Sequence, residues 1–121
     1  MFHTLCEANA DALIGTASPQ RTERAWRQTY RAANHRQARF ACVKALQDER
    51  GFPEAARQFA SHFEQMQQAR HSADYDPAAR FTKEDVRIGI ATAAQVCDAF
   101  AALSQRQKAA FAALVLFPQR D

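Results

Sequence analysis

The side chains best suited to chemistry in this 121-residue chain lie close together near its middle. Arg70, His71 and Tyr75 form the candidate catalytic set, and Asp74 and Asp76 are candidate ligand or interface residues. An arginine can stabilise a charged phosphate, and a histidine can transfer protons near neutral pH. This segment therefore could act on, or bind, a phosphate-containing ligand.

The same segment also has a purely structural explanation. Charged side chains at the end of a helix often cap its last turn and interact favourably with its dipole. Continuing the spacing of Phe59, Phe63 and Met66 by four residues leads to Arg70, which places a guanidinium at the end of an apolar face. If that guanidinium is buried, it needs an acidic side chain, a carbonyl oxygen, a partner subunit or an anionic ligand. Both explanations remain open from the sequence.

A second candidate surface is basic. Residues 20–44 contain seven Arg or Lys and one Glu, whereas the net charge of the whole chain is only +3. Arg24, Arg27 and Arg31 share a helix face, and His35 continues it if the helix is unbroken. These four are the candidate nucleic-acid-binding residues, since arginine suits phosphate recognition. Stacking aromatics are not evident on this face, and a solvated face paired with acidic side chains of other helices is the alternative.

The elements that must position these residues are predicted to be helices. Good helix formers are abundant, glycine and proline are scarce, and apolar residues recur every three or four positions. Helices are expected over about residues 2–14, from 21 or 22 to a kink or break at 34–35, 35–49, 53–71, from 82 onward, and from 104 to before 118. The short connections imply antiparallel packing. The sequence thus predicts one all-α domain over residues 1–121, an antiparallel helical bundle.

One apolar face of each helix supplies the predicted core. Its predicted members are Phe40, Cys42, Val43 and Leu46, then Phe59, Phe63 and Met66, then Val86, Ile90, Ala93, Cys97 and Phe100, and finally Phe111, Leu114 and Val115. The three cysteines are widely spaced and lack a C-x-x-C pair, so buried reduced thiols are expected rather than disulfides or a zinc site. No metal and no cofactor is predicted.

The chain is expected to be cytoplasmic. No stretch approaches the roughly 20 apolar residues that cross a bilayer, so no membrane association is predicted. The first residues also lack the basic region and cleavage site of a signal peptide.

Several motifs in order resemble the bacterial branch of the HEPN superfamily (higher eukaryotes and prokaryotes nucleotide-binding domain) that carries Arg, a few residues, then Ala-Asp-Tyr at the end of a long helix. The matching positions are Arg70 with Ala73-Asp74-Tyr75, Trp26 with Tyr30-Arg31-Ala32, Phe52-Pro53, Phe81-Thr82 and the closing residues 111–117. The resemblance covers nearly the whole chain. It implies an N-terminally truncated HEPN-like bundle that lacks the family's first helix, which predicts an exposed apolar groove along residues 2–14.

The resemblance also implies a function. Members form homodimers, and many are metal-independent endoribonuclease toxins paired with a nucleotidyltransferase-type antitoxin, with an Arg-x4–6-His motif at the dimer interface. Here the residue after the four-residue spacer is Tyr75, and a phenol is a weak general base at neutral pH. Arg57 and His62 have the literal spacing but lie in the middle of a predicted helix.

The main hypothesis is therefore a dimeric, non-catalytic module that binds RNA, a nucleotide or a protein partner. A metal-independent ribonuclease acting at the dimer interface is the first alternative. A structural or adaptor bundle without a ligand is the second.

Overall fold

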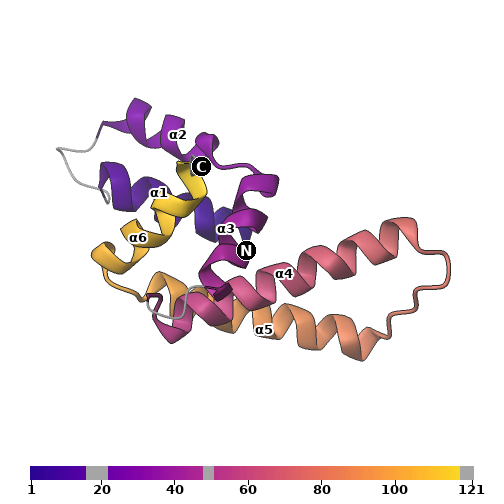
Figure 1. Ribbon diagram of the computed structural model, residues 1–121. Helices are drawn as coiled ribbons and strands as arrows, with labels where there is room; N and C mark the ends of the chain where they lie inside the picture. Colours follow the sequence, from indigo (N-terminus) through magenta and orange to yellow (C-terminus); the bar gives the residue numbers. More distant parts are fainter. Residues whose placement is uncertain (16–21, 48–50, 118–121) are drawn as a thin grey trace.

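The computed structural model describes residues 1–15, 22–47 and 51–117. These ranges form six α-helices and contain no strand, which confirms the predicted all-α bundle (Figure 1). The helices are α1 (Phe2–Ile14), α2 (Glu23–Ala32), α3 (His35–Gln47), α4 (Glu54–Tyr75), α5 (Lys83–Ala101) and α6 (Gln105–Leu116). Helix α1 packs against α2 and α6, α3 packs against α4 and α6, and α4 packs against α5.

Local hydrogen bonds set several of the helix boundaries. Thr82 Oγ1 accepts from the backbone N–H of Asp85 at 3.0 Å, while Asp85 Oδ2 accepts from the backbone N–H of Thr82 at 3.1 Å. Ser104 and Gln107 form the same reciprocal pair at the start of α6. Each pair satisfies amide donors that a helix leaves free at its N-terminus, so both starts are as predicted.

The break between α2 and α3 has a similar local cause. Asn34 Oδ1 accepts from the backbone N–H of Gln37 at 2.8 Å, as an N-cap residue does, and Ala33 before it is extended. The basic segment is therefore two helices. Residues 21 and 48–49, which fall within the expected helices, lie outside the described residues.

Helix α4 is longer than predicted. It was expected to end near residue 71, but it continues through Tyr75 and stops before Asp76. The stop has a physical reason, because a residue that precedes proline is disfavoured in helical conformation and Pro77 follows Asp76. Asp76 Oδ1 then accepts from the backbone N–H of Ala78 at 2.9 Å and holds the turn.

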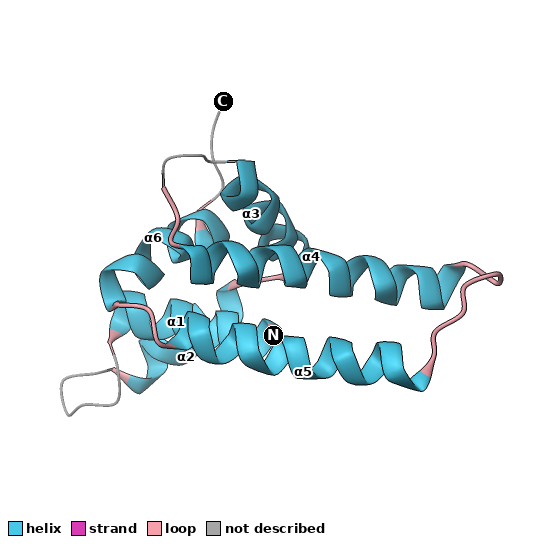
Figure 2. Cartoon of the chain, turned by 90° about the horizontal axis from the view of Figure 1, so that it is seen from below, coloured by secondary structure: helices cyan, strands magenta, loops and turns pink. Residues whose placement is uncertain are grey.

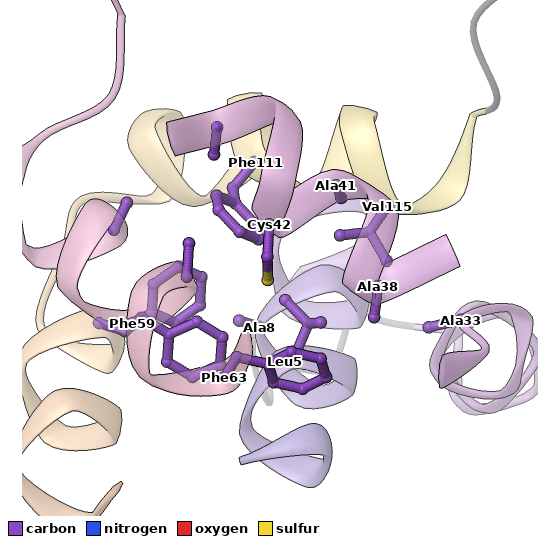
Figure 3. Packing of buried hydrophobic residues seen from close by; sticks show 14 of the residues in the cluster. Leu5, Ala8, Ala33, Ala38, Ala41, Cys42, Phe59, Phe63, Phe111 and Val115 are labelled. Atoms are coloured by element: carbon purple, nitrogen blue, oxygen red, sulfur yellow. The ribbon is translucent and has the colours of Figure 1, made fainter. Parts of the chain in front are cut away.

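Aromatic rings form the centre of the core. Phe59 stacks on Phe100 with ring centroids 4.5 Å apart, and Phe111 meets Phe100 edge-on at 5.4 Å. Figure 3 shows Phe59, Phe63 and Phe111 together with Leu5 and Cys42 of other helices. Of the predicted core residues, the fully covered ones are Cys42, Phe59, Phe63, Phe100, Phe111 and Val115.

All three cysteines are free thiols, as predicted. Cys6 and Cys42 are buried, whereas Cys97 is half-buried. Burial, with a smaller contribution from the charge of Glu64, raises the pKa of Cys42 to about 12. Its thiol is therefore protonated and unreactive at neutral pH.

Helices α4 and α5 extend together beyond the other helices as an antiparallel hairpin (Figures 1 and 2). We call residues 64–95 the arm and the rest of the described chain the body. No residue of the arm is buried, whereas the buried residues of α4 and α5 lie at 56–63 and 96–100. The prediction that Met66, Val86 and Ile90 belong to the core is therefore wrong, because no third helix covers this part of the hairpin.

The apolar groove predicted along residues 2–14 is also not observed. Leu5, Cys6, Ala8 and Ala10 of α1 are buried, because α2 and α6 both pack against this helix. Phe40 of α3, another predicted core residue, is exposed. The large apolar surface of this chain is on the arm rather than along α1.

Candidate functional site

The predicted catalytic residues lie in the last two turns of α4, near the tip of the arm. Arg70 Nε lies 4.0 Å from Asp74 Oδ2, and the rings of His71 and Tyr75 have centroids 4.8 Å apart. Both contacts join residues four apart, which the helix places on one side. The structure thus brings these four side chains together as two adjacent pairs.

Arg70 does not need a buried partner. Its side chain is 75% exposed, so the cost of burying a guanidinium does not arise. Asp74, one of the expected partners, does pair with it. Asp76 takes no part in this ion pair. It lies outside the helix, and its carboxylate accepts a hydrogen bond from the backbone N–H of Ala78. Its role as a ligand or interface residue stays a prediction.

An apolar groove of about 280 Å³ runs between α4 and α5 beside Arg70. The small residues Ala69, Ala73 and Gly89 line it together with larger apolar side chains from both helices. Those on the helices are Met66, Val86 and Ile90, and Phe81 lines the groove from the loop before α5. Arg70 is therefore a cation at the edge of an apolar surface. The sequence did not predict that Gly89 of α5 faces Met66 and Ala69 of α4, because this depends on how the two helices pack.

The alternative arginine–histidine pair is structural. His62 is buried, and its Nε2 lies 3.0 Å from the carbonyl oxygen of Gly89, which ties α4 to α5 where the arm leaves the body. Arg57 donates from Nη2 to the carbonyl oxygen of Leu46. Arg57 and His62, which have the spacing of the ribonuclease motif, are thus each hydrogen-bonded to a backbone carbonyl oxygen of another segment.

The aromatic residues of α2 attach it to α1. Trp26 Nε1 donates to Asp11 Oδ1 at 2.9 Å, and the hydroxyl of Tyr30 is hydrogen-bonded to Nδ1 of His3. The rings of Trp26 and Tyr30 also stack on each other at 5.5 Å. The aromatic face of α2 is thereby fixed toward α1, and its arginine face is left toward solvent.

Arg24, Arg27 and Arg31 share that outer face as predicted, and all three are exposed. They line a shallow concavity of about 650 Å³. Among the residues that the structure describes, no carboxylate forms an ion pair with any of the three. Glu64, one possible acidic partner, is paired with Arg39 instead, at 3.2 Å.

His35 does not continue the arginine face, because that required an unbroken helix and α2 ends before Asn34. It begins α3, after the break at Asn34, and its ring stacks on Phe2 with centroids 3.9 Å apart. The stacking fixes the start of α3 against α1. His35 instead borders a second concavity, of about 860 Å³, on the surface of α3.

Residues on that second concavity were not predicted as a site. It is lined by Arg36, Arg39 and the exposed ring of Phe40, together with Gln67 of α4. The available signal was the spacing of Arg36, Phe40 and Lys44, which are four apart and so share a helix face. This face was not predicted as a site because Phe40 was expected to be buried in the core.

Two further kinds of site are a metal centre and a membrane-spanning helix. Within the described ranges, no group of three or more His, Cys, Asp or Glu side chains is arranged to hold a metal ion. No single described helix is both long and apolar enough to cross a membrane; α5 and α6 meet such a criterion only as a pair, and they are bent by 114° at their junction.

No family model matches this chain, and no curated protein and no solved structure is significantly similar to it. The fold and surfaces therefore define it by class, as an all-α bundle with a projecting two-helix arm and a basic face on α2. The six-helix architecture is compatible with a HEPN-like fold.

Proposed function

We propose that this chain is a non-catalytic helical module that pairs with a second copy of itself through the arm. The observation that carries the proposal is the concentration of exposed apolar side chains there. Met66, Phe81, Val86 and Ile90 line one groove and are between 37% and 62% exposed, and Tyr75 and Ile88 are exposed elsewhere on the arm. Large contiguous apolar patches on a protein surface commonly mark interaction sites.

The charges of the arm favour a second copy as the occupant. Residues 64–95 contain four Arg or Lys and five Asp or Glu, so the arm is nearly neutral while the positive excess lies elsewhere. Several of these charges already pair within one helix, such as Arg70 with Asp74 and Arg87 with Glu84 at 3.4 Å. Two arms can therefore approach each other without strong electrostatic repulsion. A strongly charged partner would meet no excess of opposite charge on the arm.

The shape of the arm favours the same occupant. Ala69, Ala73 and Gly89 leave a groove between the two helices, and small residues let a neighbouring helix approach closely. Val86 and Ile90, one turn apart beside that groove, form a ridge of the kind that packs into it. One arm thus offers both parts of a self-complementary contact.

The groups near the arm tip support a non-catalytic role. Tyr75 stands where the ribonuclease motif has histidine, and it is widely exposed. His71 is next to Arg70 in the helix and contacts Tyr75, so it projects about 100° away from the guanidinium around the axis. Among the described residues, no carboxylate or other side chain is hydrogen-bonded to His71 or Tyr75 in a way that would hold either as a general base. Pairing through the groove would bring Arg70 to the interface as a binding group.

RNA or nucleotide binding is the second candidate function. The observation that favours it is the row of exposed arginines on α2, Arg24, Arg27 and Arg31, without carboxylate partners among the described residues. Such a row contacts phosphates in a salt-dependent way. A nucleotidyltransferase-type antitoxin is the protein partner that the family resemblance implies, and it would compete with the second copy for the arm.

Sedimentation velocity over a wide concentration range tests the dimer. We expect the wild type to dimerise and Ile90→Glu to weaken dimerisation at least about 30-fold, as loss of an interface hot spot does. The matched control is Leu13→Glu, which places the same charge at a side chain 54% exposed on α1, outside the arm. A wild type that stays monomeric at high micromolar concentration contradicts the proposal, as does equal dimerisation by Ile90→Glu.

The non-catalytic assignment has its own test. Purified wild type and Arg70→Ala are incubated with labelled single-stranded RNA in the presence of EDTA. We expect no cleavage by either protein. Cleavage by the wild type that Arg70→Ala abolishes would instead make the chain a metal-independent ribonuclease.

A further inference from the structure

One exposed ring on the body of the molecule has an unusual set of neighbours. Phe40 of α3 is 49% exposed, although a large apolar side chain on a helix of the body usually packs inward. Arg36 lies one turn before it and Lys44 one turn after, so the three share a face. Lys44 Nζ lies 5.6 Å from the centroid of the Phe40 ring, within range of a cation–π contact.

This ring borders the concavity of about 860 Å³ on α3. The concavity is also lined by His35, Arg36 and Arg39, with the amide of Gln67 reaching it from α4. None of the described residues that line it is acidic. Glu64, which contacts Arg39, is occupied by that ion pair at 3.2 Å and by a hydrogen bond from Gln68. The surface is therefore cationic, and the exposed ring of Phe40 is part of its lining.

We infer that this face of α3 binds single-stranded nucleic acid and that Phe40 is the platform on which an unpaired base stacks. Arg36 and Lys44, about 12 Å apart along the helix axis, contact the phosphates on either side of that base. The amide of Gln67 offers both a donor and an acceptor to the edge of the base.

The chemistry favours single strands over duplexes. Base stacking on an aromatic side chain requires an unpaired base, since the faces of paired bases are covered by their neighbours in a helix. A ring flanked by cations is the arrangement that sequence-tolerant single-strand binders use, because every base has a stackable face. A surface that binds only phosphates, such as the arginine row of α2, does not require an exposed aromatic ring such as that of Phe40.

The inference does not depend on dimerisation, since Arg36, Phe40 and Lys44 lie on α3, and Gln67, the one lining residue from the arm, is not in the apolar groove. The arginines of α2 can contact the phosphates of any nucleic acid, whereas Phe40 would discriminate single strands from duplexes. Loss of the arm contact and loss of the stacking platform are therefore separable: Ile90→Glu should leave RNA affinity per chain within about twofold, and Phe40→Ala should leave sedimentation unchanged.

Fluorescence anisotropy tests the inference with an unstructured, labelled RNA of about 20 nucleotides and the corresponding duplex, in EDTA. We expect the single strand to bind about tenfold more tightly than the duplex at equal salt. Phe40→Ala should lower single-strand affinity about 5- to 100-fold, the range found when a stacking residue is removed, and leave duplex affinity unchanged.

Three variants make the result specific. Phe40→Leu keeps apolar bulk but lacks an aromatic face, so it should behave like Phe40→Ala. Phe40→Trp should retain binding, and its indole fluorescence should be quenched when RNA is added. Phe117→Ala removes a ring that is 58% exposed at the end of α6 and away from the concavity, so it should bind as wild type does.

Three results would overturn the inference. They are wild-type affinity in Phe40→Leu, equal affinity of the wild type for single strand and duplex, and no binding of the single strand at low salt. The second of these would assign nucleic-acid binding to phosphate contacts alone, which is what the arginines of α2 provide. Circular dichroism of each variant verifies that the fold is unchanged.

Discussion

The body and the arm contain segments of the same two helices, yet they differ in what those segments bury. In the body, Phe59 of α4 and Phe100 of α5 are fully buried and stack on each other. In the arm, Met66 lies two turns after Phe59 in α4 and Ile90 lies about three turns before Phe100 in α5, and both side chains are exposed. The apolar periodicity of each helix continues past the point where other helices cover it. Spacing therefore decides which face is apolar, and coverage by other helices decides whether that face is buried.

The largest effect expected from this difference is on stability. Phe59→Ala should lower the free energy of unfolding by about 3–5 kcal/mol, because it removes a ring enclosed by Phe100 and Phe111 and leaves a cavity. Ile88→Ala in the arm should change it by less than about 0.5 kcal/mol, since that side chain is exposed. Urea unfolding at low protein concentration measures both.

The concentration dependence sharpens this first prediction. If the arms pair through the groove, Ile90→Glu should lose stability relative to wild type only at concentrations where the wild type is dimeric, whereas Ile88→Ala, outside the groove, should follow the wild type at every concentration. A large loss from Ile88→Ala at all concentrations would mean that the arm is covered within one chain.

A smaller effect compares the two capping boxes. Ser104→Ala in the body should cost about 1 kcal/mol in the free energy of unfolding, the usual value for a lost N-cap. Thr82→Ala breaks the same interaction at the arm, where the first turns of α5 have little tertiary packing. Its expected main result is faster amide hydrogen exchange in those turns, with a smaller global loss. Equal global losses from the two variants would show that arm and body unfold as one unit.

The smallest effect is a gain in stability. Gly89 lies in the middle of α5, and a Cβ there would meet Met66 Sδ at 3.5 Å, an ordinary contact. Gly89→Ala should therefore raise the free energy of unfolding by about 0.5–1 kcal/mol, because alanine restricts the unfolded chain and favours helix. Thermal unfolding of the monomer measures this gain.

The same variant tests the groove. The added methyl group enters the space between α4 and α5 that a second arm would use, so sedimentation should show weaker dimerisation despite the more stable monomer. Unchanged dimerisation would place the contact on another side of the arm.

Much of the fold could be predicted because it depends on residues near in sequence. The starts of α5 and α6 follow from Thr82 with Asp85 and from Ser104 with Gln107, each a contact across three positions. The break at Asn34 is equally local. The end of α4 was misplaced by four residues, because the helix-breaking signal is Pro77 and not the charged residues before it.

The candidate sites were predicted only in their local parts. The helix by itself brings Arg70 to Asp74 and His71 to Tyr75, and it aligns Arg24, Arg27 and Arg31. His35 leaves that face because the helix is broken at Asn34, and its ring stacks on Phe2 of another helix, a contact that local spacing does not display. Phe40 was assigned to the core because an apolar residue in a helix of mixed character does not reveal which side is covered.

The sequence by itself determined the helical class of this protein, most helix boundaries and the residues that share each helix face. These depend on hydrogen bonds and side-chain spacing within about four positions, which a sequence displays directly. Only the tertiary structure decided that α1 is covered while the arm is not, and that Phe40 faces solvent among cations. Burial depends on which distant helix lies over a face, and that is settled by the packing of the whole chain rather than by local pattern.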